Sequence, residues 1–291
     1  MKYDAIKKYA ERKNDKRREK SERGFLFGKR IESEMCGEKV VTLFYEGEKD
    51  GLFITVHGGG FLYNSVYDED CYCDFIRKIS GYNVASLDYT LSYKRGYPLQ
   101  LNQCDGQIKM LLKSGAARGG KIALVGHSAG ANLAAALALK SLRDKEYEIS
   151  ALCLNYPALN NYKLGKERKF CPFTFTNSEL DTFAEIYCEG RENRRDPYVS
   201  PLFAEDAELK LFPPTLLVKA KGDRLGEDAE RMYEKLSAVG VKAIISDAKM
   251  RHGFIEDGMR RKSGAMRGYA EQVTESTVKI LCELLSEDTR L

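Results

Sequence analysis

After residue 38 short apolar segments alternate regularly with longer helix-like segments, a pattern that few folds can accommodate. The apolar segments expected to be strands are 39–45, 52–56, 83–88, 121–126, 149–154, 215–220 and 241–247. The segments expected to be helices are 68–80, 99–114, 129–145, 227–239 and 265–286. Strands joined through helices imply right-handed crossovers and a mostly parallel sheet with helices on both faces. The sequence therefore predicts an α/β fold.

Two parts of the chain depart from this alternation. The stretch 158–213 interrupts the alternation of strands and helices and is rich in aromatic residues. Residues 1–37 begin with a strongly polar segment. We therefore predict an α/β core made of 38–157 and 214–291, a small helical cap insertion at 158–213, and an N-terminal basic arm or cap element at 1–37. The length of 291 residues and the apolar fraction of 43% are sufficient for a large core.

The positive charge of the chain is concentrated at its N-terminus. Residues 1–30 contain 12 Lys or Arg and 5 Asp or Glu, whereas the whole chain has a net charge of only +4. We interpret this segment as a solvated, partly helical arm, with a lid over the active site as the alternative. It lacks the aromatic interleaving and the motif of a nucleic-acid-binding arm, so we expect no nucleic-acid partner.

The sequence also bears on location and assembly. No run of 18 apolar residues and no apolar signal-peptide segment occur, so we expect no membrane partner and a cytoplasmic location. The eight cysteines form no metal-binding pair, and we expect no metal. Assembly is left open, with a homodimer as one option.

Two glycine-rich motifs directly follow expected strands. The first, Gly-His-Ser-Ala-Gly at 126–130, lies between a strand and a helix, where a sharp turn lifts the hydroxyl of Ser128 clear of the sheet. The alternative is a structural turn in which Ser128 only caps the following helix. The second, His-Gly-Gly-Gly-Phe at 57–61, lets backbone N–H groups converge on one point, as a developing oxyanion requires. Its glycine spacing fits no phosphate-binding loop.

The remaining candidates also follow expected strands. Asp223 comes after 215–220, and His252 comes after 241–247. The chain order Ser128, Asp223, His252 is the order found in α/β-hydrolases. The chain has only three histidines and the other two belong to the glycine motifs, so we assign His252 as the base. We assign Asp223 as the carboxylate that orients it, because Asp223 directly follows its strand and a rigid strand end best positions the base; Glu227 and Asp228 are the nearby alternatives.

These motifs, together with Ser-Pro-Leu at 200–202 and His-Gly-Phe at 252–254, resemble the hormone-sensitive-lipase-like esterases of the α/β-hydrolase fold over residues 38–286. The resemblance implies a serine carboxylester hydrolase without a cofactor. It also implies an oxyanion hole formed by the backbone of Gly59, Gly60 and Ala129. Small short-chain acyl esters, such as an acetyl ester or an acetylated sugar, are the expected substrates. An amidase or formamidase of the kynurenine-formamidase type remains the alternative on the same triad.

The chain departs from the commonest pattern of this family at three positions. His127 precedes the nucleophile where Asp is frequent, Arg224 follows Asp223 where Pro is frequent, and Thr90 ends an Asp-Tyr-Arg-like motif. These departures leave the expected catalytic roles intact.

Aromatic residues are expected to form the substrate pocket. We predict that residues 25–27 and the cap aromatics wall the acyl or alcohol group, with ordinary packing of a helical subdomain as the alternative. The cap aromatics are Phe170, Phe173, Phe175, Phe183 and Tyr187. The candidate substrate-binding residues are His57, Phe61, His127 and Phe173.

Overall fold

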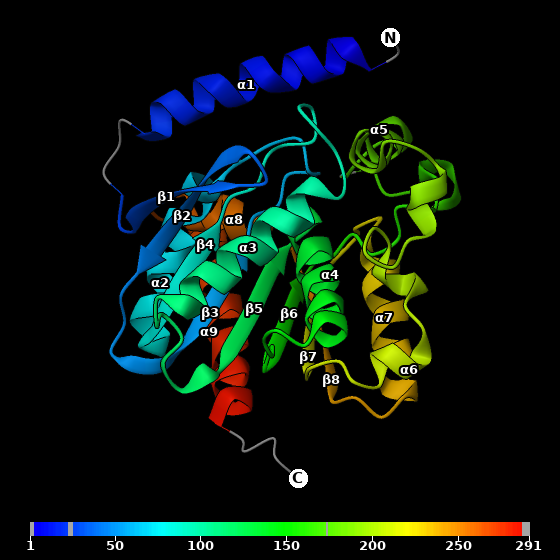
Figure 1. Ribbon diagram of the computed structural model, residues 1–291. Coiled ribbons are helices and arrows are strands. Elements are labelled where there is room, and N and C mark those ends of the chain that lie inside the picture. Colours follow the sequence, from blue (N-terminus) through cyan, green and yellow to red (C-terminus); the bar gives the residue numbers. More distant parts are fainter. Residues whose placement is uncertain (1–2, 23–25, 173, 287–291) are drawn as a thin grey trace.

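The computed structural model of the chain describes residues 3–22, 26–172 and 174–286, and the strands of this described part form one eight-stranded sheet (Figure 1). The order across the sheet is β1-β2-β4-β3-β5-β6-β7-β8. The strands are β1 (Lys29–Met35), β2 (Glu38–Tyr45), β3 (Lys49–Val56), β4 (Tyr82–Leu87), β5 (Ile122–His127), β6 (Ala151–Asn155), β7 (Thr215–Ala220) and β8 (Ala243–Ala248). Every pair from β4 to β8 is parallel, whereas β2 pairs antiparallel with both β1 and β4. The predicted mostly parallel sheet is therefore confirmed.

Helices cover both faces of this sheet (Figure 1). One face carries α3 (Leu99–Lys113), α4 (Ala129–Asp144) and α7 (Gly226–Ala238), and the other carries α2 (Asp70–Ser80), α8 (Phe254–Met259) and α9 (Ala265–Ser286). Successive side chains of a strand point to opposite faces. In β3, Ile54 accordingly packs in one apolar core and its neighbour Phe53 in the other. Burial on both sides explains why the central strands are continuous apolar runs.

The observed elements follow the predicted segments closely after residue 38. Helix α2 ends at Ser80 because Gly81 adopts a left-handed conformation with φ 75°, as the sequence predicted. Strand β1 was not predicted, since its charged residues suggested a solvated arm. It pairs with β2 along its whole length, and this pairing places residues 29–35 at the edge of the sheet.

The segment 158–213 forms short helices beyond the carboxyl ends of the strands. Its main helix, α5 (Asn177–Cys188), begins at a capping box in which Thr176 and Glu179 satisfy each other's backbone N–H groups. The other short elements of this segment are α6 (Asp206–Leu209) and the 3₁₀ turns η3 (Gly165–Glu167), η4 (Glu192–Arg195) and η5 (Pro201–Phe203). Two further 3₁₀ turns, η1 (Val66–Glu69) and η2 (Arg118–Gly120), lie in the core. Helix α5 lies at the top of the view in Figure 1.

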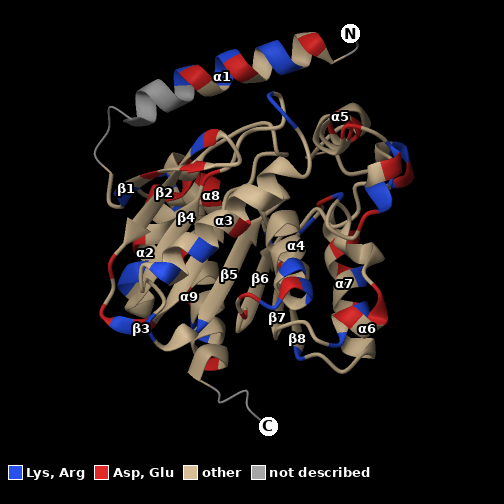
Figure 2. Cartoon of the chain, in the orientation of Figure 1, with Lys and Arg blue, Asp and Glu red and all other residues tan. Residues whose placement is uncertain are grey.

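Helix α1 (Asp4–Glu22) lies across the same end of the molecule (Figure 1). It is anchored by the buried Asn14, whose Nδ2 donates to the carbonyl of Leu62 at 2.7 Å. Figure 2 shows both basic and acidic residues along α1, so the described part of the helix does not present a single sign of charge. Its role as a lid stays a prediction. None of the helices within the described residues is long and apolar enough to cross a bilayer.

Candidate active site

Ser128 lies on a sharp turn between β5 and α4. Its backbone has φ 54° and ψ −112°, a conformation that is costly for a residue with a side chain. The turn is held by the backbone N–H of Ser128, which donates to the carbonyl of Asn155 at 2.9 Å. The strain therefore lies at the one residue whose hydroxyl the turn presents.

The glycines on either side of Ser128 are required by close backbone contacts. A Cβ at Gly126 would lie 2.4 Å from the carbonyl oxygen of Gly130, and a Cβ at Gly130 would lie 2.0 Å from that of Val56. The second contact brings the turn against the end of β3, where the other glycine motif begins. The two motifs are thus packed together because neither glycine carries a side chain.

The structure brings Ser128, His252 and Asp223 together in one hydrogen-bonded chain. The Ser128 hydroxyl lies 2.8 Å from His252 Nε2, and His252 Nδ1 lies 2.6 Å from Asp223 Oδ2. Asp223 follows β7, and His252 precedes α8 just after β8. The other carboxylate oxygen, Oδ1, accepts from the N–H of Leu225 at 3.0 Å and from Thr174 Oγ1 at 3.5 Å. These two contacts fix the orientation of the carboxylate, and neither donor could be recognised from the sequence.

Burial and neighbouring charges have opposite effects on the pKa values of His252 and Asp223. Burial alone would lower the pKa of His252, but the charge and hydrogen bond of Asp223, with smaller contributions from Glu256 and Asp257, raise it overall. Burial would raise the pKa of Asp223, but His252 and the hydrogen bonds to the carboxylate lower it overall. Asp223 is therefore ionised near neutral pH and stabilises a proton on the imidazole.

Two of the three predicted oxyanion residues, Gly60 and Ala129, lie beside Ser128, and Gly59 directly precedes Gly60. Gly59 and Gly60 have positive φ values of 119° and 60°, which explains the need for glycine at both positions. Gly60 and Ala129 line a cavity together with Ser128. The backbone N–H groups of Gly59, Gly60 and Ala129 donate to no acceptor within the described part of the chain. They are free to bind an oxygen that carries negative charge.

The cavity beside Ser128 is small and lies between the core and the cap. Phe61 lines it, as predicted, and so do Phe175 and Phe183 from the cap. Phe175 also contacts the imidazole of His252 edge-on, with ring centres 4.7 Å apart. Phe173 lies outside the described residues.

The other predicted aromatics lie elsewhere. Tyr187 is fully buried behind Phe61 and stacks on its ring. Phe170 is 79% exposed and does not line this cavity. Leu26 and Phe27 lie near α2, because Asp70 accepts the backbone N–H of Phe27 and β1 then leads the chain along the sheet edge. Residue 25 lies outside the described part.

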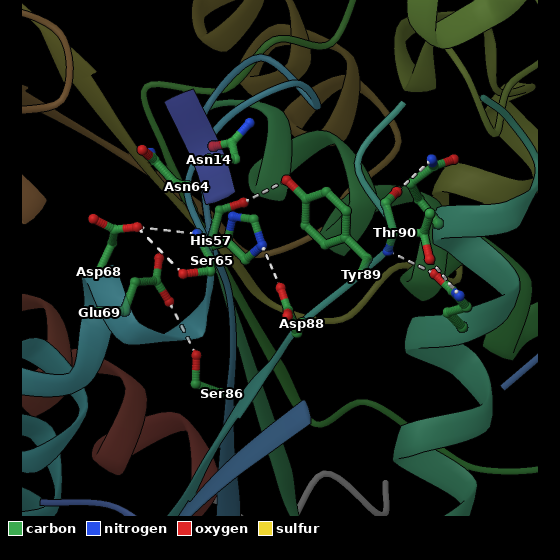
Figure 3. Close-up of polar contacts among 12 residues, drawn as sticks. Asn14, His57, Asn64, Ser65, Asp68, Glu69, Ser86, Asp88, Tyr89 and Thr90 are labelled. Atoms are coloured by element: carbon green, nitrogen blue, oxygen red, sulfur yellow. Dashed lines mark hydrogen bonds and ion pairs between the residues drawn. The ribbon is translucent and has the colours of Figure 1, made fainter. Parts of the chain in front are cut away.

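His57 does not reach the cavity, contrary to the prediction that it contacts substrate. Its ring is buried and stacked on Tyr89, and its Nε2 lies 3.3 Å from Asp88 Oδ1 (Figure 3). The Tyr89 hydroxyl donates to the carbonyl of His57 at 3.0 Å (Figure 3). These contacts hold the start of the glycine loop, so His57 supports the candidate oxyanion residues from behind.

His127 also points away from the cavity. Successive side chains of a strand alternate, and the imidazole at the end of β5 is therefore enclosed beneath the turn. Its Nδ1 lies 3.1 Å from the hydroxyl of Tyr156, which donates to the carboxylate of Glu256. Its Nε2 lies 3.8 Å from Glu69. This buried group of two carboxylates, a histidine and a tyrosine was not predicted, because its members are far apart in sequence.

Arg224 connects the strand end that carries Asp223 to the cap. Its guanidinium is buried and donates to the carbonyls of Phe175 and Gly165 and to the side chain of Asn177. These contacts explain a basic residue at the position where the family commonly has proline. Within residues 3–22, 26–172 and 174–286, no cluster of three metal-ligating side chains is found.

Comparison with known proteins identifies the family. Residues 53–256, well over half of the chain, match the family described as the alpha/beta hydrolase fold. The chain belongs to this alpha/beta hydrolase family. The match confirms the resemblance to hormone-sensitive-lipase-like esterases that the motifs indicated.

Relatives of this alpha/beta hydrolase carry esterase names. It is 28% identical to an arylesterase of Saccharolobus solfataricus, over 67% of this chain and 65% of that protein. It is 27% identical to an acetyl esterase of Salmonella schwarzengrund, over 68% and 64% of the two chains. The matched part thus spans just under two thirds of either relative. The crystal structure of an esterase from Pyrobaculum calidifontis superposes with a TM-score of 0.77 at 25% identity, covering 96% of this chain and 93% of that one.

Proposed function

We propose that this alpha/beta hydrolase is a serine carboxylester hydrolase that cleaves small short-chain acyl esters, such as acetyl esters or acetylated sugars, through an acyl-enzyme. The observation that carries the proposal is the hydrogen-bonded chain from Ser128 through His252 to Asp223, beside free backbone N–H groups. The esterase names of the relatives support the same reaction class.

In the first half-reaction, Ser128 Oγ attacks the ester carbonyl carbon while His252 Nε2 takes the hydroxyl proton. The Asp223 carboxylate holds the proton of Nδ1 and stabilises the imidazolium that forms. The N–H groups of Gly59, Gly60 and Ala129 bind the oxyanion, and one such donor is typically worth about 2.7–4 kcal/mol. The carbon–oxygen bond to the alcohol then breaks, and His252 donates its proton to the leaving oxygen.

In the second half-reaction, water replaces the alcohol. His252 Nε2 takes a proton from the water, whose oxygen attacks the acyl carbon bound to Ser128. The same N–H groups bind the second oxyanion. Collapse of this intermediate releases the carboxylic acid and returns the proton to Ser128 Oγ.

The size of the cavity supports a short acyl or alcohol group. The free volume beside Ser128 is about 30 Å³. Roughly 10–15 Å³ of such volume holds one water molecule, so the cavity accepts a group of a few non-hydrogen atoms. Phe175 and Phe183 limit extension toward the cap.

Substitution of Ser128 tests the proposal. Ser128→Ala should abolish hydrolysis of p-nitrophenyl acetate and leave the melting temperature nearly unchanged, since the hydroxyl hydrogen-bonds only to His252 within the described residues. Acetylated xylo-oligosaccharide and N-formylkynurenine, assayed in parallel with the unmodified protein, separate ester from amide hydrolysis. A Ser128→Ala variant with the unmodified rate would refute the assignment of the nucleophile.

A further inference from the structure

One wall of the cavity beside Ser128 carries uncharged polar side chains. Asn160 and Asn161, in the loop after β6, line the cavity and are only 6% and 8% exposed. The cap contributes aromatic and aliphatic side chains to the same cavity, among them Phe183 and Leu180. Two adjacent side-chain amides are therefore nearly buried at a small cavity, and their polar atoms need hydrogen-bond partners.

Each of these amides uses one of its polar atoms to hold the loop. Asn160 Oδ1 accepts from the N–H of Lys163 at 3.0 Å, and Asn161 Nδ2 donates to the carbonyl of Val199 at 2.7 Å. The opposite atoms remain free: Asn160 Nδ2 donates to nothing and Asn161 Oδ1 accepts nothing within the described part of the chain. Neither is among the fully enclosed unpartnered atoms of the described residues, so both keep access to a ligand.

Two cationic residues, Lys163 and Arg168, also line the cavity, and the charge of each is balanced. The buried guanidinium of Arg168 pairs with Asp228 at 2.8 Å and also donates to the carbonyl of Asn160 at 2.6 Å. Lys163 Nζ pairs with Glu227 at 2.6 Å. Because each cation has its own carboxylate, the wall does not select a negatively charged group. It offers one donor and one acceptor without net charge.

A nearly buried polar atom without a partner is unfavourable unless a ligand or water satisfies it. A free N–H donor and a free carbonyl acceptor on two residues that line the same cavity match a hydroxyl, which can both accept and donate, and the donor alone matches an ether oxygen. An unsubstituted alkyl chain in the same place would leave both amide atoms unpartnered. The wall therefore discriminates against purely apolar groups of the same size.

We propose that Asn160 and Asn161 are specificity-determining residues that bind an uncharged oxygen function, a hydroxyl or ether oxygen, carried by the acyl or alcohol part of the ester close to the reacting carbon. This inference rests on the proposed esterase function. It places the substrates among small oxygenated esters rather than simple alkyl esters.

The test uses pairs of esters that differ only by exchange of one CH₂ for oxygen. For the acyl part, p-nitrophenyl methoxyacetate is compared with p-nitrophenyl butanoate. For the alcohol part, 2-methoxyethyl acetate is compared with butyl acetate. The ratio of kcat/KM within a pair, compared between protein variants, cancels the intrinsic reactivity of the two esters.

Asn160→Leu removes the free donor, and we expect it to lower the ratio for one of the pairs by about 5- to 10-fold relative to the unmodified protein. Asn160→Asp keeps the acceptor for Lys163 N–H and also removes the donor, so it should lower the same ratio even if the leucine variant folds poorly. Asn102→Leu, at an exposed position on α3, is the matched control and should leave both ratios unchanged.

The outcomes separate the two proposals. If the unmodified protein hydrolyses these esters but both ratios are the same in Asn160→Leu and Asn160→Asp, the inference about the polar wall is wrong and the esterase function stands. If the unmodified protein hydrolyses none of the four esters, the proposed function itself fails.

Discussion

Replacing Asp223 by asparagine tests the hydrogen-bonded chain of Ser128, His252 and Asp223 at the carboxylate, whose orientation is fixed by its other contacts. Oδ1 of Asp223 is held by the N–H of Leu225 at 3.0 Å, and an N–H donor there requires an oxygen. Asparagine must therefore place its carbonyl oxygen toward Leu225 and its NH₂ group toward His252. The NH₂ group donates to Nδ1, so the proton of the neutral imidazole moves to Nε2, which faces Ser128.

The magnitude follows from this change of tautomer. An imidazole protonated on Nε2 cannot accept the proton of Ser128, and the same substitution in a serine-protease triad lowers kcat by about 10⁴-fold. Each factor of ten corresponds to about 1.36 kcal/mol, so the barrier should rise by about 5.4 kcal/mol. The side chains are nearly equal in size, and the fold should be retained.

The assay is steady-state hydrolysis of p-nitrophenyl acetate, with the melting temperature measured on the same preparation. Asp247→Asn is the matched control, since Asp247 is exposed on β8 and, among the described residues, forms an ion pair only with Lys219. It should retain the unmodified rate. An Asp223→Asn variant that is folded and within tenfold of the unmodified kcat would refute the reasoning about the tautomer.

Three further outcomes can be measured. Because neutral His252 is the base and its pKa is raised above the ordinary 6.5, kcat/KM should fall as the pH drops, with a midpoint above 6.5; Glu256→Gln removes a nearby negative charge and should move this midpoint to lower pH. A midpoint that stays in place would contradict a charge effect of Glu256. Gly130→Ala should lower both activity and the melting temperature, because its Cβ would lie 2.0 Å from the carbonyl of Val56; an unchanged thermal transition would show that the turn is looser than described. Arg224→Met should raise KM for p-nitrophenyl acetate more than it lowers kcat, since it releases the cap from the core, and a KM equal to that of the unmodified protein would argue against this contact.

The parts of the site that could be predicted are those that follow strand ends. Parallel strands bring their carboxyl ends to one edge, so Ser128, Asp223 and His252 could be placed together from their positions after three expected strands. The glycines around Ser128 were informative for a related reason, because a tight strand-to-helix turn tolerates no side chain beside it. The arrangement of Ser128, Asp223 and His252 could therefore be predicted largely from local sequence patterns.

The parts that could not be predicted depend on contacts between distant segments. The charged strand β1 is stabilised by pairing with β2, and its own sequence resembles a solvated segment. His127 adjoins the nucleophile in sequence, but its side chain points to the opposite side and meets Glu69 and Glu256 from other elements. The free amide atoms of Asn160 and Asn161 are likewise apparent only once the loop is folded.

Strand β8 is an edge strand of the sheet, and this position affects how the protein is inactivated by denaturant. In the described part of the chain this strand pairs with β7 alone, and most of its side chains are half-buried or exposed. It nevertheless leads directly into the turn that carries His252. Edge strands of a sheet unfold locally at a lower free energy cost than central strands. Low concentrations of denaturant should therefore inactivate the protein while most of its helical circular dichroism signal persists. Local unfolding of the edge strand β8 is enough to move the His252 imidazole away from Ser128.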